Sequence, residues 1–286
     1  MGQEGIDSSR PWHVYATPYT PHLSPILSLG IYLFSHPGIL EPSNPLFPAQ
    51  YQYNRYADIL GKVVGSNKEE FGRLGVDIGT LGTHSARKGA ATFAASGCTI
   101  SPSMASICNR AGWKMGDTRD KYIKYEAAGD QFLGRTVCGT SSLTKEFAHS
   151  PPFFDSSPQE QTHIDEYIKK HLVGGRDIDE KLFAVVRMCF ASVCYHHEYL
   201  QKHLAPTHRY RSNTLFINIP RVRYFFVFHV HDQVTNFNCY FILSLYYRQF
   251  KREQSFFQTT NALLLLARPT LQVFHLMLLF LTTYPT

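Results

Sequence analysis

No two of the six cysteines form a C-x-x-C pair, and they lie at irregular intervals along 286 residues. Zinc ribbons need closely spaced thiolates, and disulfide frameworks belong to short secreted chains, so neither class is indicated. We therefore expect reduced thiols in a cytosolic or nuclear protein, with no metal site and no small-molecule cofactor. The N-terminal residues also lack the basic segment and the following apolar segment of a secretory signal peptide.

Long uninterrupted apolar runs are missing as well. Residues 261–283 are strongly apolar, but Arg268 and Pro269 divide them into two runs. Each run is shorter than the roughly 20 residues that a transmembrane helix needs, so we expect no membrane partner. With 44% hydrophobic and 17% charged residues, the composition is typical of a globular protein. The formal net charge of +6 suits a polyanionic partner without demanding one.

Local signals in the first 82 residues predict one short helix and a glycine-rich loop. Residues 1–50 are rich in proline, and Ser24 followed by Pro25 is typical of a helix start. Residues 51–82 carry six glycines, which favour turns over a long element.

From residue 83 to 139 the pattern changes to three compact helical segments. Thr83 is expected to cap the first segment. A second helix is expected to begin at Ser101 and to end at Gly112, because glycine is common just after the last helical turn. Asp117 is expected to cap the third.

By composition the chain falls into four parts. Residues 1–140 hold the motifs described below, and residues 141–180 are interpreted as a polar linker. Residues 181–216 begin with an amphipathic stretch whose apolar residues recur at helical spacing. Residues 217–286 are dense in aromatic and aliphatic residues without a clear period, and we interpret this tail as sequence from outside the ancestral domain.

His84 and Arg87 form the first chemical motif, within the sequence THSARKGAATF. A spacing of three residues at a helix start places both side chains on one face. A guanidinium can bind a phosphate oxygen while an imidazole donates or accepts a proton, as a phosphodiester transition state requires. Taken alone the pair is a weak signal, because a capping histidine beside a solvated arginine is an equally ordinary arrangement.

Trp113 and Tyr122 form the second motif, within RAGWKMGDTRDKY. A tyrosine hydroxyl can attack phosphorus and form a covalent phosphotyrosyl link, which divides strand exchange into two reversible steps. The indole N–H of Trp113 can donate a hydrogen bond to the same phosphate. Burial in a hydrophobic core is the alternative explanation for each aromatic residue.

Together these motifs resemble the tyrosine recombinases, the phage-integrase type. In that family H-x-x-R is followed by a glycine and a histidine or tryptophan, and nine residues later by the nucleophilic tyrosine. The eukaryotic mobile-element branch, the Crypton-like recombinases, is the most similar in the sequences THSARKGAATF, RAGWKMGDTRDKYIKYEAAGD and GRTVCG. Weaker similarity extends over residues 3–216, including PWHVYATP and SPILSLGIYLF.

The resemblance implies a role for each matched residue. Tyr122 is the nucleophile, Arg87 the second catalytic arginine, His84 its neighbouring acid–base residue, and Trp113 occupies the histidine/tryptophan position. Tyr125 is a competing nucleophile, although Tyr122 alone keeps the nine-residue spacing.

Three basic residues are expected to contact backbone phosphates of double-stranded DNA, without taking part in the chemistry: Lys88, Lys114 and Arg119.

Three departures from the family pattern bear on activity. The family has a first arginine well upstream of H-x-x-R and a lysine on a β-hairpin between them, and no residue before His84 matches either position. The N-terminal DNA-clamping domain has no counterpart either. Loss of one charge-stabilising group typically costs about 10²–10³-fold in rate, so we expect impaired catalysis.

The sequence therefore predicts a mainly α-helical protein, the C-terminal part of a recombinase catalytic core with at most a small β element. The helices of residues 24–140 are expected to pack together, with a helix near 181–204 behind them. The expected function is DNA binding in recombination or integration, in the nucleus, with a homo-oligomer on DNA as a further possibility. Two alternatives stay open: a non-catalytic module resembling a helix-turn-helix, and a decayed product without function.

Overall fold

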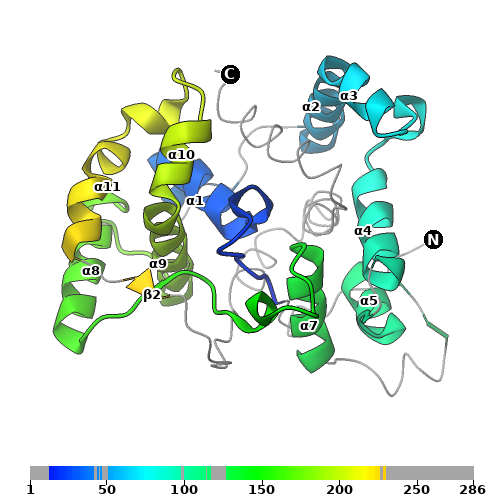
Figure 1. The fold of residues 1–286 in the computed structure, drawn as a ribbon. Helices are drawn as coiled ribbons and strands as arrows, with labels where there is room; N and C mark the ends of the chain where they lie inside the picture. Colours follow the sequence, from blue (N-terminus) through cyan, green and yellow to red (C-terminus); the bar gives the residue numbers. More distant parts are fainter. Residues whose placement is uncertain are drawn as a thin grey trace. The chain divides into compact units, whose positions relative to one another are not determined.

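The protein is mainly α-helical, as expected, and forms two compact units (Figure 1). Of the described residues, unit 1 contains 13–15 and 51–147, and unit 2 contains 16–46 and 148–229. The computed structural model describes residues 13–41, 44, 46, 51–97, 100–113, 115–116, 127–225 and 228–229.

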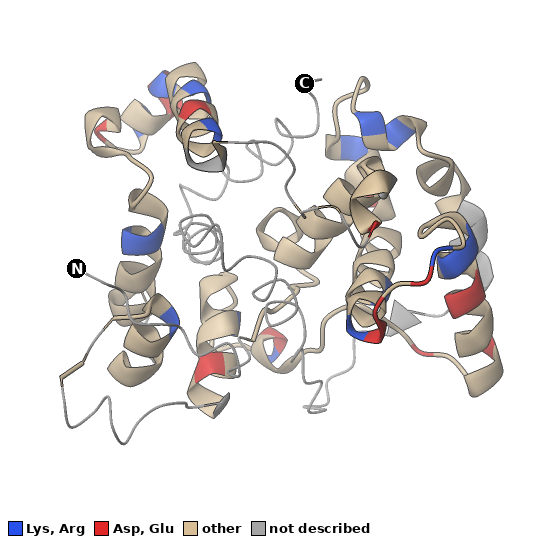
Figure 2. Cartoon of the chain, turned by 180° about the vertical axis from the view of Figure 1, so that it is seen from behind, with Lys and Arg blue, Asp and Glu red and all other residues tan. Residues whose placement is uncertain are grey.

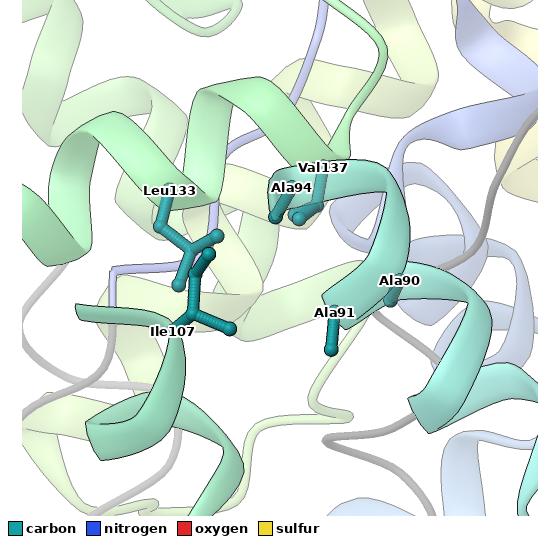
Figure 3. Close-up of a cluster of buried hydrophobic side chains, with 6 residues drawn as sticks. All are labelled: Ala90, Ala91, Ala94, Ile107, Leu133 and Val137. Carbon is teal, nitrogen blue, oxygen red and sulfur yellow. The ribbon is translucent and has the colours of Figure 1, made fainter. Parts of the chain in front are cut away.

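Three helices of unit 1 pack against one another: α4 (Ser85–Ser96), α5 (Met104–Ala111) and α7 (Ala127–Val137). Small side chains on α4 let its partners approach closely, and these helices share one buried cluster (Figure 3). The cluster consists of Ala90, Ala91 and Ala94 from α4, Ile107 from α5, and Leu133 and Val137 from α7.

The expectation of turns over residues 51–82 is wrong for most of that segment. The structure has a long helix, α2 (Gln52–Ser66), followed by α3 (Lys68–Arg73) and the 3₁₀ helix η3 (Ile78–Thr80). Gly61 and Gly65 lie on an open side of α2, where an added Cβ would meet nothing within 4 Å. Each therefore costs about 1 kcal/mol in helix propensity, which burial of the opposite face offsets.

The starts of α4 and α5 differ from the expected ones by a few residues. His84, not Thr83, is the N-cap of α4, because a turn comes first in which the Gly82 N–H donates to Ser85 Oγ at 2.9 Å. At α5 the capping residue is Ser103, whose hydroxyl accepts from the Ser106 N–H at 3.1 Å. The end of α5 at Gly112 is as expected.

Unit 2 is built around α9 (Glu180–Tyr195), which packs against α1 (Pro25–Ser35). As expected, α1 follows Ser24, whose hydroxyl accepts from the Leu27 N–H. A Cβ on Gly30 would lie 3.0 Å from the Cys189 carbonyl oxygen, so glycine permits the close approach of the two helices.

The remaining elements of unit 2 surround this pair. They include two-residue strands that pair antiparallel, with Phe153 opposite His229. The elements are η1 (Pro21–Leu23), η2 (Pro37–Leu40), β1 (Phe153–Phe154), α8 (Pro158–His171), α10 (His197–His203), η5 (Arg209–Ser212), α11 (Thr214–Phe225) and β2 (Phe228–His229). A short 3₁₀ helix, η4 (Lys145–Ala148), lies where the chain passes from unit 1 to unit 2.

Part of the expected polar linker over residues 141–180 is the helix α8. Its N-terminus has a full capping box, in which Ser157 and Glu160 exchange side-chain and backbone hydrogen bonds. Ile164 and Ile168 are fully buried against the rest of unit 2. The composition of α8 is polar because only these two isoleucines, one turn apart, are buried. A helix was therefore not expected there.

The expected arrangement of one helical group over 24–140 is also not what the structure shows. The segment expected as one helix over 181–204 is divided at His196 into α9 and α10. α9 packs on α1 in unit 2, whereas α4, α5 and α7 belong to unit 1. Helical periodicity predicts which face of a helix is buried, but not which other helix packs against that face.

The boundary expected at residue 217 falls inside a helix. α11 runs through it, with Leu215, Phe216 and Ile219 buried. The rest of the atypical tail, residues 230–286, lies outside the described residues. Within the part of the chain that the structure describes, no helix is both long enough and apolar enough to span a bilayer.

Candidate nucleic-acid interface

The structure brings Arg87 and Trp113 together from two helices. Arg87 lies in the first turn of α4, and Trp113 follows the glycine that ends α5. The Cζ atom of Arg87 lies 5.8 Å from the centroid of the Trp113 ring, within the range of a cation–π contact. The two motifs that the sequence presents separately therefore meet at one place in unit 1.

The end of α5 sets the position of Trp113. Gly112 has φ +66, the left-handed conformation that glycine adopts without strain. The Trp113 N–H donates to the Cys108 carbonyl at 2.9 Å, and the Gly112 N–H to the Asn109 carbonyl at 3.1 Å. These bonds satisfy the last carbonyls of the helix and turn the chain back toward α4. The indole keeps 44% of its surface exposed, so one side of the pair is open to solvent.

Arg87 carries a charge that no carboxylate among the described residues neutralises. Burial lowers the pKa of Arg87, but an arginine stays protonated at neutral pH. Within the described residues no Asp or Glu pairs with its guanidinium. A partly buried, unpaired guanidinium in the first turn of a helix is an arrangement that favours an anion.

The surrounding sequence is free of acidic residues. No Asp or Glu occurs from residue 78 to residue 116, whereas that stretch has four lysines and arginines. Figure 2 accordingly shows basic but no acidic positions along α4 and α5. This excess of basic over acidic residues within the stretch suits a phosphate backbone.

His84 and Lys88 lie beside Arg87 in the sequence, and both are exposed. The His84 side chain makes no capping hydrogen bond, and in the described part of the chain none joins it to Arg87. Both side chains are thus accessible to a ligand at the start of α4.

Lys114, Arg119 and Tyr122, together with Tyr125, lie outside the described residues. Their expected roles stay predictions. Among the residues that are described, no group of three His, Cys, Asp or Glu side chains is placed to hold a metal ion.

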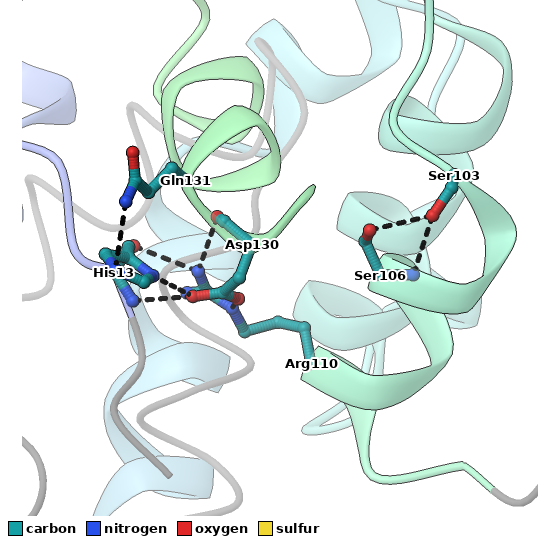
Figure 4. Close-up of polar contacts among 6 residues, drawn as sticks. All are labelled: His13, Ser103, Ser106, Arg110, Asp130 and Gln131. Atoms are coloured by element: carbon teal, nitrogen blue, oxygen red, sulfur yellow. Dashed lines mark hydrogen bonds and ion pairs between the residues drawn. The ribbon is translucent and has the colours of Figure 1, made fainter. Parts of the chain in front are cut away.

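Sequence reasoning missed a buried polar network next to this site (Figure 4). Arg110 Nε donates to Asp130 Oδ1 at 2.5 Å, and its Nη2 donates to the His13 carbonyl at 2.9 Å. The His13 N–H donates to Asp130 Oδ2 at 2.7 Å, and His13 Nδ1 lies 2.8 Å from the same oxygen. All three residues are at most 5% exposed. We call these residues the Arg110 network.

The electrostatics of the Arg110 network favour an ionised Asp130. Burial alone would raise the pKa of its carboxyl, but the Arg110 charge and hydrogen bonds from His13 and Arg110 outweigh burial and lower it. A signal for the pair was present in the sequence. Arg110 is three residues after the buried Ile107, and Asp130 three before the buried Leu133, so each charge lies on the apolar side of its helix.

The chain around His13 is held along α7 by further contacts. A Cβ on Gly134 would lie 2.5 Å from the His13 carbonyl oxygen, so only glycine allows this approach. The Cys138 thiol donates to the Tyr15 carbonyl at 3.2 Å, and Arg135 Cζ lies 4.7 Å from the Tyr15 ring centroid. Burial raises the pKa of Cys138 to about 12, which makes it a structural thiol rather than a nucleophile.

Comparison of the chain with known protein families, with curated proteins and with solved structures finds no match.

Proposed function

We propose that the protein binds double-stranded DNA at the start of α4 and the end of α5, as a descendant of mobile-element tyrosine recombinases. The Arg87–Trp113 pair supports this proposal most directly, because a guanidinium without a carboxylate partner in the described part of the chain lies against the exposed indole at the two motif positions. The stretch from residue 78 to residue 116, which has four basic and no acidic residues, adds to this support.

Each side chain contributes a different interaction in the proposed complex. The Arg87 guanidinium binds non-bridging oxygens of one phosphate, and the indole N–H of Trp113 donates to the same group. Lys88 is exposed and contacts a neighbouring phosphate, together with Lys114 and Arg119. Tyr122 is the proposed nucleophile for the phosphate that Arg87 binds.

The first test compares two double variants that remove the same charge from different helices. Arg87→Ala with Lys88→Ala removes two positive charges from α4, and Lys169→Ala with Lys170→Ala removes two from α8 in unit 2. Binding to a short duplex is measured by fluorescence anisotropy from 50 to 300 mM salt. We expect only the α4 variant to weaken binding and to reduce the salt slope, by about one unit for each lost phosphate contact.

The second test is covalent trapping on a nicked suicide duplex, with Tyr122→Phe as the control. An adduct that forms with the unmodified protein and is lost in Tyr122→Phe would support Tyr122 as the nucleophile, whereas duplex binding without an adduct would contradict a nucleophilic role for it. Duplex binding that tolerates loss of both Arg87 and Lys88 would favour the non-catalytic helix-turn-helix-like module. Absence of duplex binding in the unmodified protein would leave a product without DNA function.

A further inference from the structure

The Arg110 network and the Arg87–Trp113 pair share one short stretch of chain. Arg110 occupies the last turn of α5, Gly112 reverses the backbone, and Trp113 comes next. Two helical-end hydrogen bonds, to the Cys108 and Asn109 carbonyls, connect the turn to the same helix. The side chain of Arg110 is therefore anchored three residues before the indole that contacts Arg87.

We infer that His13, Arg110 and Asp130 position Trp113 against Arg87. The expected effect of these residues on DNA affinity rests on the proposed function. The Arg110 network acts through the backbone at the end of α5 and touches no ligand itself, so its members are positioning residues.

The geometry makes the end of α5 stiff. Arg110 donates through Nε and Nη2 to three acceptors: the Asp130 carboxylate, the Asp130 carbonyl at 3.1 Å and the His13 carbonyl (Figure 4). It reaches two other stretches of the chain at once, α7 and the segment at His13. If α5 rotated about its axis or slid along it, several of these charge-assisted bonds would break together.

A purely structural role is the alternative, since a buried ion pair that loses one partner is strongly destabilising wherever it lies. The two explanations differ in what happens at Trp113. A structural role predicts loss of stability alone, whereas positioning predicts that disturbing Asp130 or His13 changes the Arg87–Trp113 contact in the folded protein.

The test uses Trp113 as the reporter. The chain has two tryptophans, so Trp12→Phe leaves Trp113 as the sole tryptophan fluorophore. In this background Asp130→Asn should shift the emission of Trp113 in the same direction as Arg87→Ala does. Combining the two should give no further shift. Acrylamide quenching should rise in parallel, because an indole released from Arg87 is more accessible.

His13→Ala is the second variant, in case Asp130→Asn does not fold. It removes one ring contact to Asp130 but keeps the backbone N–H and carbonyl that bind Asp130 and Arg110. Asp165→Asn is the control, because Asp165 is also an aspartate paired with an arginine, Arg187, but in unit 2 and partly exposed. The control should leave the emission of Trp113 unchanged.

Affinity for a short duplex completes the test. Asp130→Asn should bind about tenfold more weakly than the unmodified protein, and should add little to Trp113→Phe. The inference would be overturned if the variants lost stability while the emission of Trp113 stayed unchanged, and if their effects on binding added to that of Trp113→Phe. If the unmodified protein binds no DNA but the emissions are coupled, the proposed function fails and the positioning role stands.

Discussion

At the scale of single residues, two buried histidines of unit 2 bear on stability. His196 and His208 are at most 4% exposed. Burial lowers the pKa of His196 to about 4, and burial together with the nearby Arg211 and His36 lowers the pKa of His208 to about 4. The Tyr210 N–H also donates to His208 Nδ1 at 3.1 Å, which requires that nitrogen to be unprotonated. Both rings are therefore neutral in the folded protein at neutral pH.

This neutrality predicts acid lability of the fold. In an unfolded chain a histidine has a pKa near 6.5, so between about pH 6.5 and 4 protons bind the unfolded state preferentially. As the pH is lowered through this range, the free energy of unfolding should fall by up to about 1.4 kcal/mol per pH unit for each histidine. Urea denaturation at pH 7.5, 6.0 and 5.0 measures this free energy. His196→Phe should make it depend less steeply on pH. Stability independent of pH over this range would contradict the prediction.

The Arg110 network shows what single residues reveal in the sequence. A charge on the apolar side of a helix indicates a buried partner, and both Arg110 and Asp130 could be recognised in this way. The identity of the partner could not be recognised. Arg110 and His13 are 97 positions apart in the sequence, and no local pattern encodes a contact over such a separation.

At the scale of elements, α8 is the clearest departure from expectation. Ser157→Ala removes the hydroxyl of its capping box and should lower the free energy of unfolding by about 1 kcal/mol. Thr162→Ala is the matched control, because Thr162 is exposed in the same helix and its hydroxyl bonds only back to the Pro158 carbonyl. Denaturant unfolding compares the two. Equal, negligible effects would mean that residues 158–171 behave as the linker first expected.

α2 and α8 were missed for related reasons. Glycine density over 51–82 suggested turns, yet Gly61 and Gly65 lie on the open side of α2 and cost only propensity. Polar composition over 141–180 suggested a linker, yet Ile164 and Ile168 suffice to bury one face of α8. In both elements tertiary packing outweighs local preference.

At the scale of the whole molecule, α11 crosses the expected boundary between the ancestral domain and the tail. Ile219 is fully buried, and Ile217, two residues earlier on the same helix, is 64% exposed. Ile219→Ala should therefore cost about 2–5 kcal/mol in stability, while Ile217→Ala should stay within about 0.5 kcal/mol of the unmodified protein.

Thermal and denaturant unfolding of the two isoleucine variants separates the interpretations. If everything after residue 216 were foreign to the fold, truncating either side chain would leave stability unchanged. A selective effect of Ile219 places the helix within unit 2, whatever the origin of the residues that follow it.

The division into units was beyond the reach of sequence patterns. Residues 16–46 and 148–229 form one unit although more than a hundred residues separate them. Helix periodicity tells which face of α1 or α9 is buried, but not that the two bury each other. Shape complementarity decides that, as Gly30 against Cys189 illustrates.

Local interactions explain what the sequence by itself determined: the mainly helical class, the start of α1 at Ser24 and the end of α5 at Gly112. Caps and turns are made between residues a few positions apart, so their chemistry can be read directly from the chain. The tertiary structure alone decided the meeting of Arg87 with Trp113 and the burial of Arg110 against Asp130 and His13. Those contacts depend on how α4, α5 and α7 pack, and packing is settled by the fit of whole helical faces.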